Sequence, residues 1–281
     1  MVTSSAEIAP AEVAAHYDDL DYFYRDVWGE HVHHGLWLRG DESREEAVRQ
    51  LVQLVAEEAR VAPGARVCDI GCGYGATARM LATEFRADVT AITLSEAQHT
   101  FALASHATDA HPVSYLLADW LTNDLPPESF DAAIAIESSE HMPDLAAFFR
   151  QAYRVLRPGG RLVVCAWLSA NAPSARAERW LLEPICREGR MPQMGTVADY
   201  HRIGAAAGFP TPNHRDLTPQ VARTWPTIAR VFARKLLSRP VYLRFLFTRH
   251  ARNRIFALTI FRIWLAYRTG AMRYGVLTFT K

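Results

Sequence analysis

Two carboxylates and an imidazole lie close together in the stretch ESSEHMPD, residues 137–144. This stretch follows the apolar run AAIAI, which is typical of a buried strand, so Glu137, Glu140 and His141 are expected where a strand ends. In open α/β sheets, ligands bind at the carboxyl ends of the strands. Any of these three side chains could act there as a general base that removes a proton from a substrate.

His141 is the first candidate for the base, because an unperturbed imidazole titrates near neutral pH. Glu140 is the second candidate. Other interpretations stay open: His141 could cap a helix that begins near Asp144, one glutamate could be a structural acceptor in a buried turn, or proximity alone could suffice. The stretch therefore predicts the floor of an active site and leaves the role of each side chain undecided.

A second candidate site lies in VCDIGCGYG, residues 67–75. Asp69 lies near the end of an apolar run, and Gly71 and Gly73 follow in the turn to a helix. Glycines let a ligand approach the backbone, and the amides at a helix N-terminus are free to bind it. The spacing differs from the GxGxxG fingerprint of dinucleotide sites. A tight turn without a ligand is the alternative.

Short apolar runs alternate with amphipathic segments from residue 65 to residue 167, which predicts a parallel sheet covered by helices on both faces. Strands are expected over 65–70, 87–94, 113–118, 130–136, 161–167, around 212–217 and, antiparallel, over 272–280. Helices are expected over 12–27, 44–60, 73–85, 95–107, 144–157 and 198–207, with a mainly helical insertion over about 219–270.

The charge is divided unevenly along the chain. Residues 217–281 contain thirteen basic side chains and no acidic one, whereas residues 1–216 contain 18 basic and 30 acidic side chains. A basic segment of this kind usually has a partner. That partner could be an anionic substrate, a membrane surface or the acidic part of the same chain. No recognised nucleic-acid motif accompanies the basic residues, so nucleic acid is not expected.

Cysteine usage and hydropathy indicate a cytoplasmic protein. The four cysteines form no CxxC pair, which favours reduced thiols. The N-terminus lacks the profile of a signal peptide. The apolar run at 255–261 is far too short to span a bilayer, which needs about 20 residues.

Three histidines lie in the segment HVHHGLW, residues 31–37. A metal site is the least favoured interpretation, because no cluster of acids or cysteines accompanies them, and no metal is expected. A solvent-exposed turn and a lid over a substrate are the other interpretations.

The chain resembles class I S-adenosylmethionine (SAM)-dependent methyltransferases. Residues 69–75 match their DxGCGxG motif, FDAAIAIES lies at their fourth strand, and VLRPGGRLVV leads into their fifth. Within this fold the chain is similar to the group of tocopherol methyltransferases, natural-product sugar O-methyltransferases and cyclopropane-fatty-acid synthases. That similarity is carried by AHYDDL, WGEHVHHGLW, ITLSEAQ, ADW, ESSEHMPD and YRTGAMRYG.

The resemblance implies a Rossmann-like α/β fold. Its sheet should have seven mostly parallel strands with an antiparallel last strand. It also implies N-terminal helices over the SAM site (1–60), a SAM-binding core (61–217), a helical substrate lid (218–270) and the last core strand (271–281).

The resemblance also assigns site residues. SAM should contact Tyr17, Asp69, Gly71, Gly73, Thr93, Leu94, Gln98, Asp119, Trp120 and Glu137. The threonine and glutamine replace the acid that often binds the ribose hydroxyls. The histidine-rich segment should form a substrate lid through His33, His34 and Trp37. Glu137, Glu140 and His141 should lie at the methyl-transfer site.

We therefore expect a methyltransferase that acts on a lipophilic, ring-containing or prenylated small molecule of specialised metabolism. The SAM cofactor should be its source of methyl groups, and the basic lid could also rest on a membrane. Two alternatives stay open. One is a C-methyltransferase whose lid arginines bind a prenyl diphosphate, and the other is a SAM-binding cyclase on the same fold.

Overall fold

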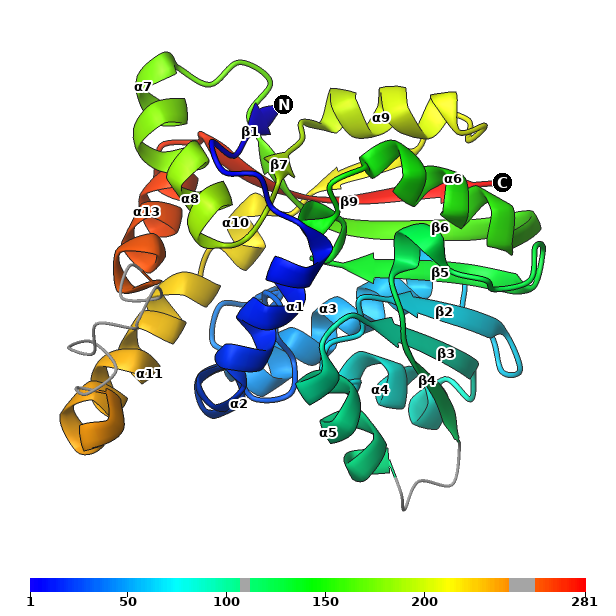
Figure 1. Ribbon diagram of the computed structural model, residues 1–281, viewed down its shortest axis with the longest axis horizontal. Helices are drawn as coiled ribbons and strands as arrows, with labels where there is room; N and C mark the ends of the chain where they lie inside the picture. Colours follow the sequence, from blue (N-terminus) through cyan, green and yellow to red (C-terminus); the bar gives the residue numbers. More distant parts are fainter. Residues whose placement is uncertain (107–111, 243–255) are drawn as a thin grey trace.

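A seven-stranded mixed sheet forms the centre of the protein (Figure 1). The computed structural model describes residues 1–106, 112–242 and 256–281. The spatial order of the strands is β4-β3-β2-β5-β6-β9-β8, and only β9 is antiparallel to its neighbours. The strands are β2 (Arg66–Ile70), β3 (Asp88–Thr93), β4 (Val113–Leu117), β5 (Phe130–Ile136), β6 (Leu156–Ser169), β8 (Asn213–Asp216) and β9 (Met272–Thr280). This topology confirms the expected fold class.

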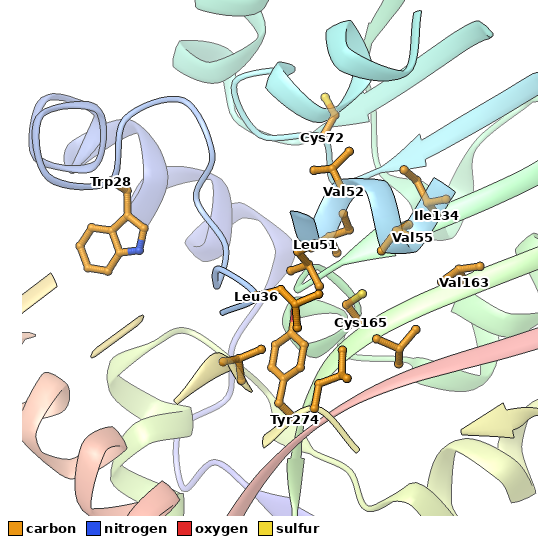
Figure 2. Packing of buried hydrophobic residues seen from close by; sticks show 14 of the residues in the cluster. Trp28, Leu36, Leu51, Val52, Val55, Cys72, Ile134, Val163, Cys165 and Tyr274 are labelled. Atoms are coloured by element: carbon orange, nitrogen blue, oxygen red, sulfur yellow. The ribbon is translucent and has the colours of Figure 1, made fainter. Parts of the chain in front are cut away.

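Helices cover both faces of the sheet, which explains why its inner strands are apolar along most of their length. Helices α3 (Arg44–Glu58) and α4 (Ala76–Glu84) pack on one face, and α6 (Leu145–Val155) and α9 (Val197–Ala206) pack on the other. The consecutive β2 residues Val67 and Cys68 are fully buried in opposite cores. Figure 2 shows the first core, where Leu51, Val52 and Val55 of α3 lie beside Ile134, Val163 and Cys165 of the sheet.

The helix expected over 12–27 is two helices, α1 (Pro10–Asp19) and α2 (Asp21–Trp28). The break follows from their different partners. Helix α1 packs on α5 (Glu96–His106), where the Asp18 carboxylate accepts hydrogen bonds from Ser95 and Ala97. Helix α2 packs instead on α11 (Thr224–Ser238) of the lid. Tertiary contacts thus override a continuous helical pattern.

The strand expected over 161–167 begins earlier than predicted, at Leu156. The PGG sequence therefore lies inside β6, where the register against β5 shifts. Gly159 has a φ of +79° and its amide donates to the carbonyl of the last residue, Lys281. Pairing with the end of the chain explains why a turn sequence becomes part of a strand.

Helices outside the expected lid pack against it. Besides α10 (Thr218–Val221), α11 and α13 (Phe256–Arg268), the chain has α7 (Ala175–Ala177), the π-helical turn η3 (Glu178–Leu182) and α8 (Glu183–Glu188). Helix α13 packs against α8, η3 and α11. The short β7 (Gln193–Met194) pairs with β1 (Val2–Thr3). The part of the predicted insertion at 243–255 lies outside the described residues, and with it Arg244, Arg249, Arg252 and Arg254.

Part of the basic C-terminal segment pairs with acidic residues of the same chain. Lys235 and Arg239 both contact Asp26, at 2.7 and 3.0 Å. Further ion pairs join Arg262 to Glu188, Arg273 to Asp216 and Lys281 to Glu128. Intramolecular pairing therefore accounts for some of the charge asymmetry.

The four cysteines are free and buried, as expected for reduced thiols. In the described parts of the chain, no helix combines the length and the apolar character needed to cross a membrane.

Candidate active site

Two loops that follow neighbouring parallel strands form the centre of the site. Residues 71–75 follow β2, and residues 137–142 follow β5. From β2 the chain adds β3 and β4 on one side of the sheet, and β5 and β6 lie on the other side, so the direction of strand addition reverses between β2 and β5. Such a reversal creates a crevice where ligands bind. A Cβ on Gly71 would lie 2.4 Å from that of Ser138, and φ at Gly71 is +76°. Only glycine fits here, because the two loops touch and the backbone is left-handed.

A cavity of about 730 Å³ opens beside these loops. The residues expected to contact SAM line it, with the exception of Asp69: they are Tyr17, Gly71, Gly73, Thr93, Leu94, Gln98, Asp119, Trp120 and Glu137. We refer to it as the cofactor cavity.

Asp69, which does not line the cofactor cavity, is the buried carboxylate of β2 next to the glycine turn. Asp69 is 2% exposed, and its Oδ2 has no hydrogen-bond partner among the described residues. Burial raises the pKa of Asp69 to about 7. A buried carboxylate oxygen without a partner is costly, and a donor on a bound ligand would satisfy it.

Polar groups of the cofactor cavity are held in place by the protein. The Thr93 hydroxyl donates to Gln98 Oε1 at 2.8 Å. The Asp119 carboxylate accepts from the Leu121 amide at 2.9 Å, and the Trp120 indole donates to the Phe148 carbonyl at 3.3 Å. These bonds fix the orientation of the Trp120 ring, which can cover a flat base.

A second cavity, of about 710 Å³, lies beneath the lid, and we refer to it as the acceptor cavity. Its wall is largely aromatic and aliphatic: Tyr24, Trp28, Trp167, Ile185, Met191, Trp225 and Ile263, with His16, His33, His34 and Glu140 as polar members. No arginine or lysine side chain belongs to this lining within the described parts of the chain. Trp37 lies outside both cavities, and its indole donates to the Glu42 carbonyl.

The two cavities share a wall formed by Tyr17, Val32, Glu137 and His141. The Tyr17 hydroxyl lies 3.0 Å from His141 Nε2, and His141 Nδ1 lies 3.0 Å from the Arg190 carbonyl. A carbonyl can only accept, so Nδ1 carries the proton and Nε2 accepts from Tyr17. Helix α6 is capped by the carboxylate of Asp144, which accepts from the Ala147 amide, and not by His141.

Burial determines the ionisation of this pair. It lowers the pKa of His141 below its usual 6.5 and raises the pKa of Tyr17 well above 10. At neutral pH the imidazole is therefore unprotonated on Nε2, and the phenol keeps its proton.

The Glu137 carboxylate is fully occupied by hydrogen bonds from the protein. Oε1 accepts from the His34 amide and the Tyr274 hydroxyl, and Oε2 accepts from His34 Nδ1 and the Trp167 indole, all within 2.7–2.9 Å. Burial alone would raise the pKa of Glu137, but His34 and its hydrogen bonds lower it below 4.5. Glu137 is thus an ionised structural acceptor in the shared wall, with a left-handed φ of 55°.

His34 joins this carboxylate to the lid. Its side chain is 1% exposed, and its Nε2 accepts from the Trp225 indole of α11 at 2.8 Å and lies 3.2 Å from the Tyr267 hydroxyl of α13. Because an indole N–H can only donate, Nε2 accepts and Nδ1 carries the proton that faces Glu137. Both ring nitrogens are therefore used within the protein.

Glu140 differs from Glu137 in having no histidine partner. Its Oε1 accepts from the Trp167 amide at 2.6 Å, and Oε2 lies 2.9 Å from the Ser139 hydroxyl. Burial raises the pKa of Glu140 to about 8. The carboxyl group is therefore mainly protonated at neutral pH, which makes it a poor base there.

His31 and His33 form a chain of hydrogen bonds. His31 Nδ1 lies 3.1 Å from His33 Nε2, and His33 Nδ1 donates to the His34 carbonyl. Within residues 1–106, 112–242 and 256–281, no group of three histidine, cysteine or acidic side chains is placed to hold a metal ion. His33 and His34 line the acceptor cavity.

Several site residues carry no clear signal in the sequence. Trp167 could have been found, because it lies toward the carboxyl end of a predicted strand. Trp225 and Tyr267 could not have been found, because nothing in the sequence of the helical insertion indicates which aromatic side chains face His34.

Comparison with known proteins gives three kinds of match. The model of the family described as mycolic acid cyclopropane synthetase matches residues 5–237. Tocopherol O-methyltransferase of Arabidopsis thaliana is 28% identical over 99% of this chain and 84% of its own length. The 27-O-demethylrifamycin SV methyltransferase of Amycolatopsis mediterranei is 34% identical over 79% of this chain and 82% of its own. Among solved structures, the cyclase SpnF superposes with a TM-score of 0.78 and 25% identity, covering 100% of this chain and 99% of its own.

Proposed function

The chain belongs to the mycolic acid cyclopropane synthetase family of class I SAM-dependent methyltransferases, and we propose that it methylates a hydroxyl group of a lipophilic, ring-containing small molecule. Membership of the family confirms the resemblance, the enzyme class and the cofactor expected from the sequence. The proposal concerns the acceptor and the roles of individual residues.

One observation carries the proposal: a hydrogen-bonded tyrosine and histidine lie in the wall between the two cavities. A methyl group must pass through this wall to reach an acceptor beneath the lid. Tyr17 and His141 are therefore close to the reacting atoms, and His141 Nε2 is available as a base. The cofactor supplies an electrophilic methyl group on a sulfonium.

We propose that the proton of the acceptor leaves through this pair. The acceptor hydroxyl would pass its proton to the Tyr17 oxygen while the Tyr17 proton moves to His141 Nε2. Bound SAM would supply the methyl group for the new oxygen–methyl bond and leave as S-adenosylhomocysteine. The Arg190 carbonyl keeps accepting from Nδ1 and stabilises the imidazolium that results. A positioned base of this kind contributes about 10²–10⁴-fold to the rate.

The lining of the acceptor cavity supports a neutral, lipophilic acceptor. Aromatic rings cover most of it, and the described residues place no guanidinium or ammonium group there. This favours a ring compound over a prenyl diphosphate, whose charge would need arginines. The names of two relatives, tocopherol O-methyltransferase and 27-O-demethylrifamycin SV methyltransferase, support the same class.

A cyclase that binds SAM without methyl transfer is the second candidate. The cyclase SpnF covers the whole of this chain at 25% identity, so the fold is compatible with such chemistry. An unused base in the shared wall would then be difficult to explain.

An assay with SAM labelled in its methyl group tests the proposal. The acceptors would be prenylated quinols, phenolic polyketides, hydroxylated glycosides and prenyl diphosphates. The proposal predicts label in a hydroxylated ring compound, with one S-adenosylhomocysteine formed for each methyl group. Label in a diphosphate, or acceptor consumption without S-adenosylhomocysteine, would contradict it.

A further inference from the structure

Large apolar side chains stand exposed on the outer side of the lid. Trp180 in η3 is 62% exposed, Phe261 and Leu258 in α13 are 54% and 49% exposed, and Leu237 at the end of α11 is 91% exposed. Single exposed apolar residues are common on proteins. Several large ones on neighbouring elements indicate a binding surface.

The elements that carry these side chains form one layer. Helix α13 packs against η3 and α8 on one side and against α11 on the other. In Figure 1 this layer lies along the left edge of the molecule, beyond the end of the sheet. We refer to the exposed apolar side chains of this layer, Trp180, Leu237, Leu258 and Phe261, as the docking face.

The same elements carry unpaired positive charge. Five exposed arginines on them form no ion pair with any residue that the structure describes: Arg176, Arg179, Arg230, Arg234 and Arg268. The Arg179 guanidinium lies 5.3 Å from the ring centre of Trp180, and that of Arg268 lies 5.6 Å from the ring centre of Trp264. Helices α11 and α13 contain no acidic residue.

The docking face lies directly behind the acceptor cavity. Ile185 of α8 and Thr259 and Ile263 of α13 line that cavity, so the layer has one side toward the acceptor and the other toward solvent.

We propose that the docking face binds the surface of an anionic lipid bilayer. Aromatic and aliphatic side chains enter the region between headgroups and acyl chains, and the arginines contact the lipid phosphates while their stems cover apolar surface. Helices α11 and α13, which contain no acidic residue, complement the negative surface potential of such a membrane, whereas η3 also carries the exposed Glu178. The proposed function supplies only the reason for this binding, and the binding itself is tested without any acceptor.

The test is sedimentation of the full chain with phosphatidylcholine vesicles that contain or lack phosphatidylglycerol. The first variant is Trp180→Ala with Phe261→Ala, and the second is Arg230→Glu with Arg234→Glu. The matched control is Leu103→Ala with Leu117→Ala, whose side chains are 49% and 48% exposed on α5 and β4, at the other end of the sheet. Thermal unfolding shows that each variant is folded.

The proposal predicts binding to the anionic vesicles, weakened at least about tenfold by either lid variant and unchanged by the control, with strong salt dependence. Methyl transfer to an acceptor free in solution should stay normal in the lid variants, so failure of the docking face and failure of the proposed function are distinguishable. Three results would overturn the inference: no vesicle binding, equal loss in the control, or a dimer that the lid variants dissociate.

Discussion

The cofactor cavity and the acceptor cavity are similar in size but differ in how the chain builds them. Loops after β2, β3 and β5 and the residues that follow β4 form most of the first, each within a few residues of a strand end. The second combines side chains from α1, α2, residues 32–34, the loop after β5, β6, α8, α11 and α13. The first site is thus fixed by the sheet, whereas the second depends on how the lid packs. Substitutions should be able to alter one without the other, except in the shared wall.

We expect the largest effect at Glu137, because this carboxylate lies in the wall that both cavities share. In Glu137→Gln an amide would face donors that now share a carboxylate. A buried donor that loses its acceptor costs about 1–3 kcal/mol. We expect a loss of that size in the free energy of unfolding, measured by urea denaturation, with activity falling in parallel.

Glu140→Gln is the matched control for this change. Its carboxyl is protonated at neutral pH, and a glutamine can keep both of its hydrogen bonds, so we expect little change in the free energy of unfolding at pH 7.

The pH dependence of the free energy of unfolding provides a second check on Glu137. The pKa of Glu137 is lower in the folded protein than in the unfolded chain, so its ionised form stabilises the wild type above about pH 4.5. This stabilisation is lost as the pH falls through the lowered pKa of the folded protein. Equal stability of the Glu137→Gln and Glu140→Gln proteins at pH 7 would show that Glu137 is not a structural centre.

Gly71→Ala should affect the cofactor cavity alone. A Cβ there would collide with Ser138, and a φ of +76° costs a non-glycine residue about 1–2 kcal/mol. We expect SAM affinity to fall about tenfold or more by calorimetry, because the loop must move to relieve the contact. Gly159→Ala is the control, since φ is +79° there and no atom lies within 4 Å of the added carbon. Normal SAM binding by the Gly71→Ala protein would count against the assignment of the cofactor cavity.

Substitutions of two tryptophans test whether the cofactor cavity and the acceptor cavity can be altered separately. Trp225 lines the acceptor cavity, and Trp225→Phe removes one donor to His34. Trp120 lines the cofactor cavity, and Trp120→Phe removes the donor to the Phe148 carbonyl. Each change should cost about 1 kcal/mol. We expect Trp225→Phe to raise the KM of the acceptor several-fold and Trp120→Phe to raise that of SAM. If each variant changed both KM values equally, the two cavities would not be separable.

The smallest effect expected is on the pH dependence. The base must be unprotonated, so kcat/KM should fall with decreasing pH only through the lowered pKa of His141, below 6.5. Ionisation of Glu140 near pH 8 places a second negative charge beside the shared wall and should produce a decline at high pH. In Glu140→Gln that decline should disappear while the acidic limb stays. An unchanged profile would show that Glu140 does not titrate in this range.

The sequence predicts the first cavity better than the second for a physical reason. Gly71, Thr93, Gln98 and Trp120, which the resemblance assigns to the cofactor, belong to short motifs at strand ends, and all four line the cofactor cavity. The acceptor cavity depends on contacts between distant segments, such as His34 with Trp225, which no local pattern encodes. The same limit explains the broken first helix and the early start of β6, because both depend on partners far along the chain.

The central claim is that Tyr17 and His141 carry the proton out of the acceptor. The most direct test measures kcat/KM for the acceptor and the Kd for SAM in Tyr17→Phe and His141→Gln. The account predicts a fall of about 10²–10⁴-fold in kcat/KM for His141→Gln, and a large fall for Tyr17→Phe. The Kd for SAM should change little in His141→Gln. Wild-type turnover in both variants, with normal SAM binding, would contradict it.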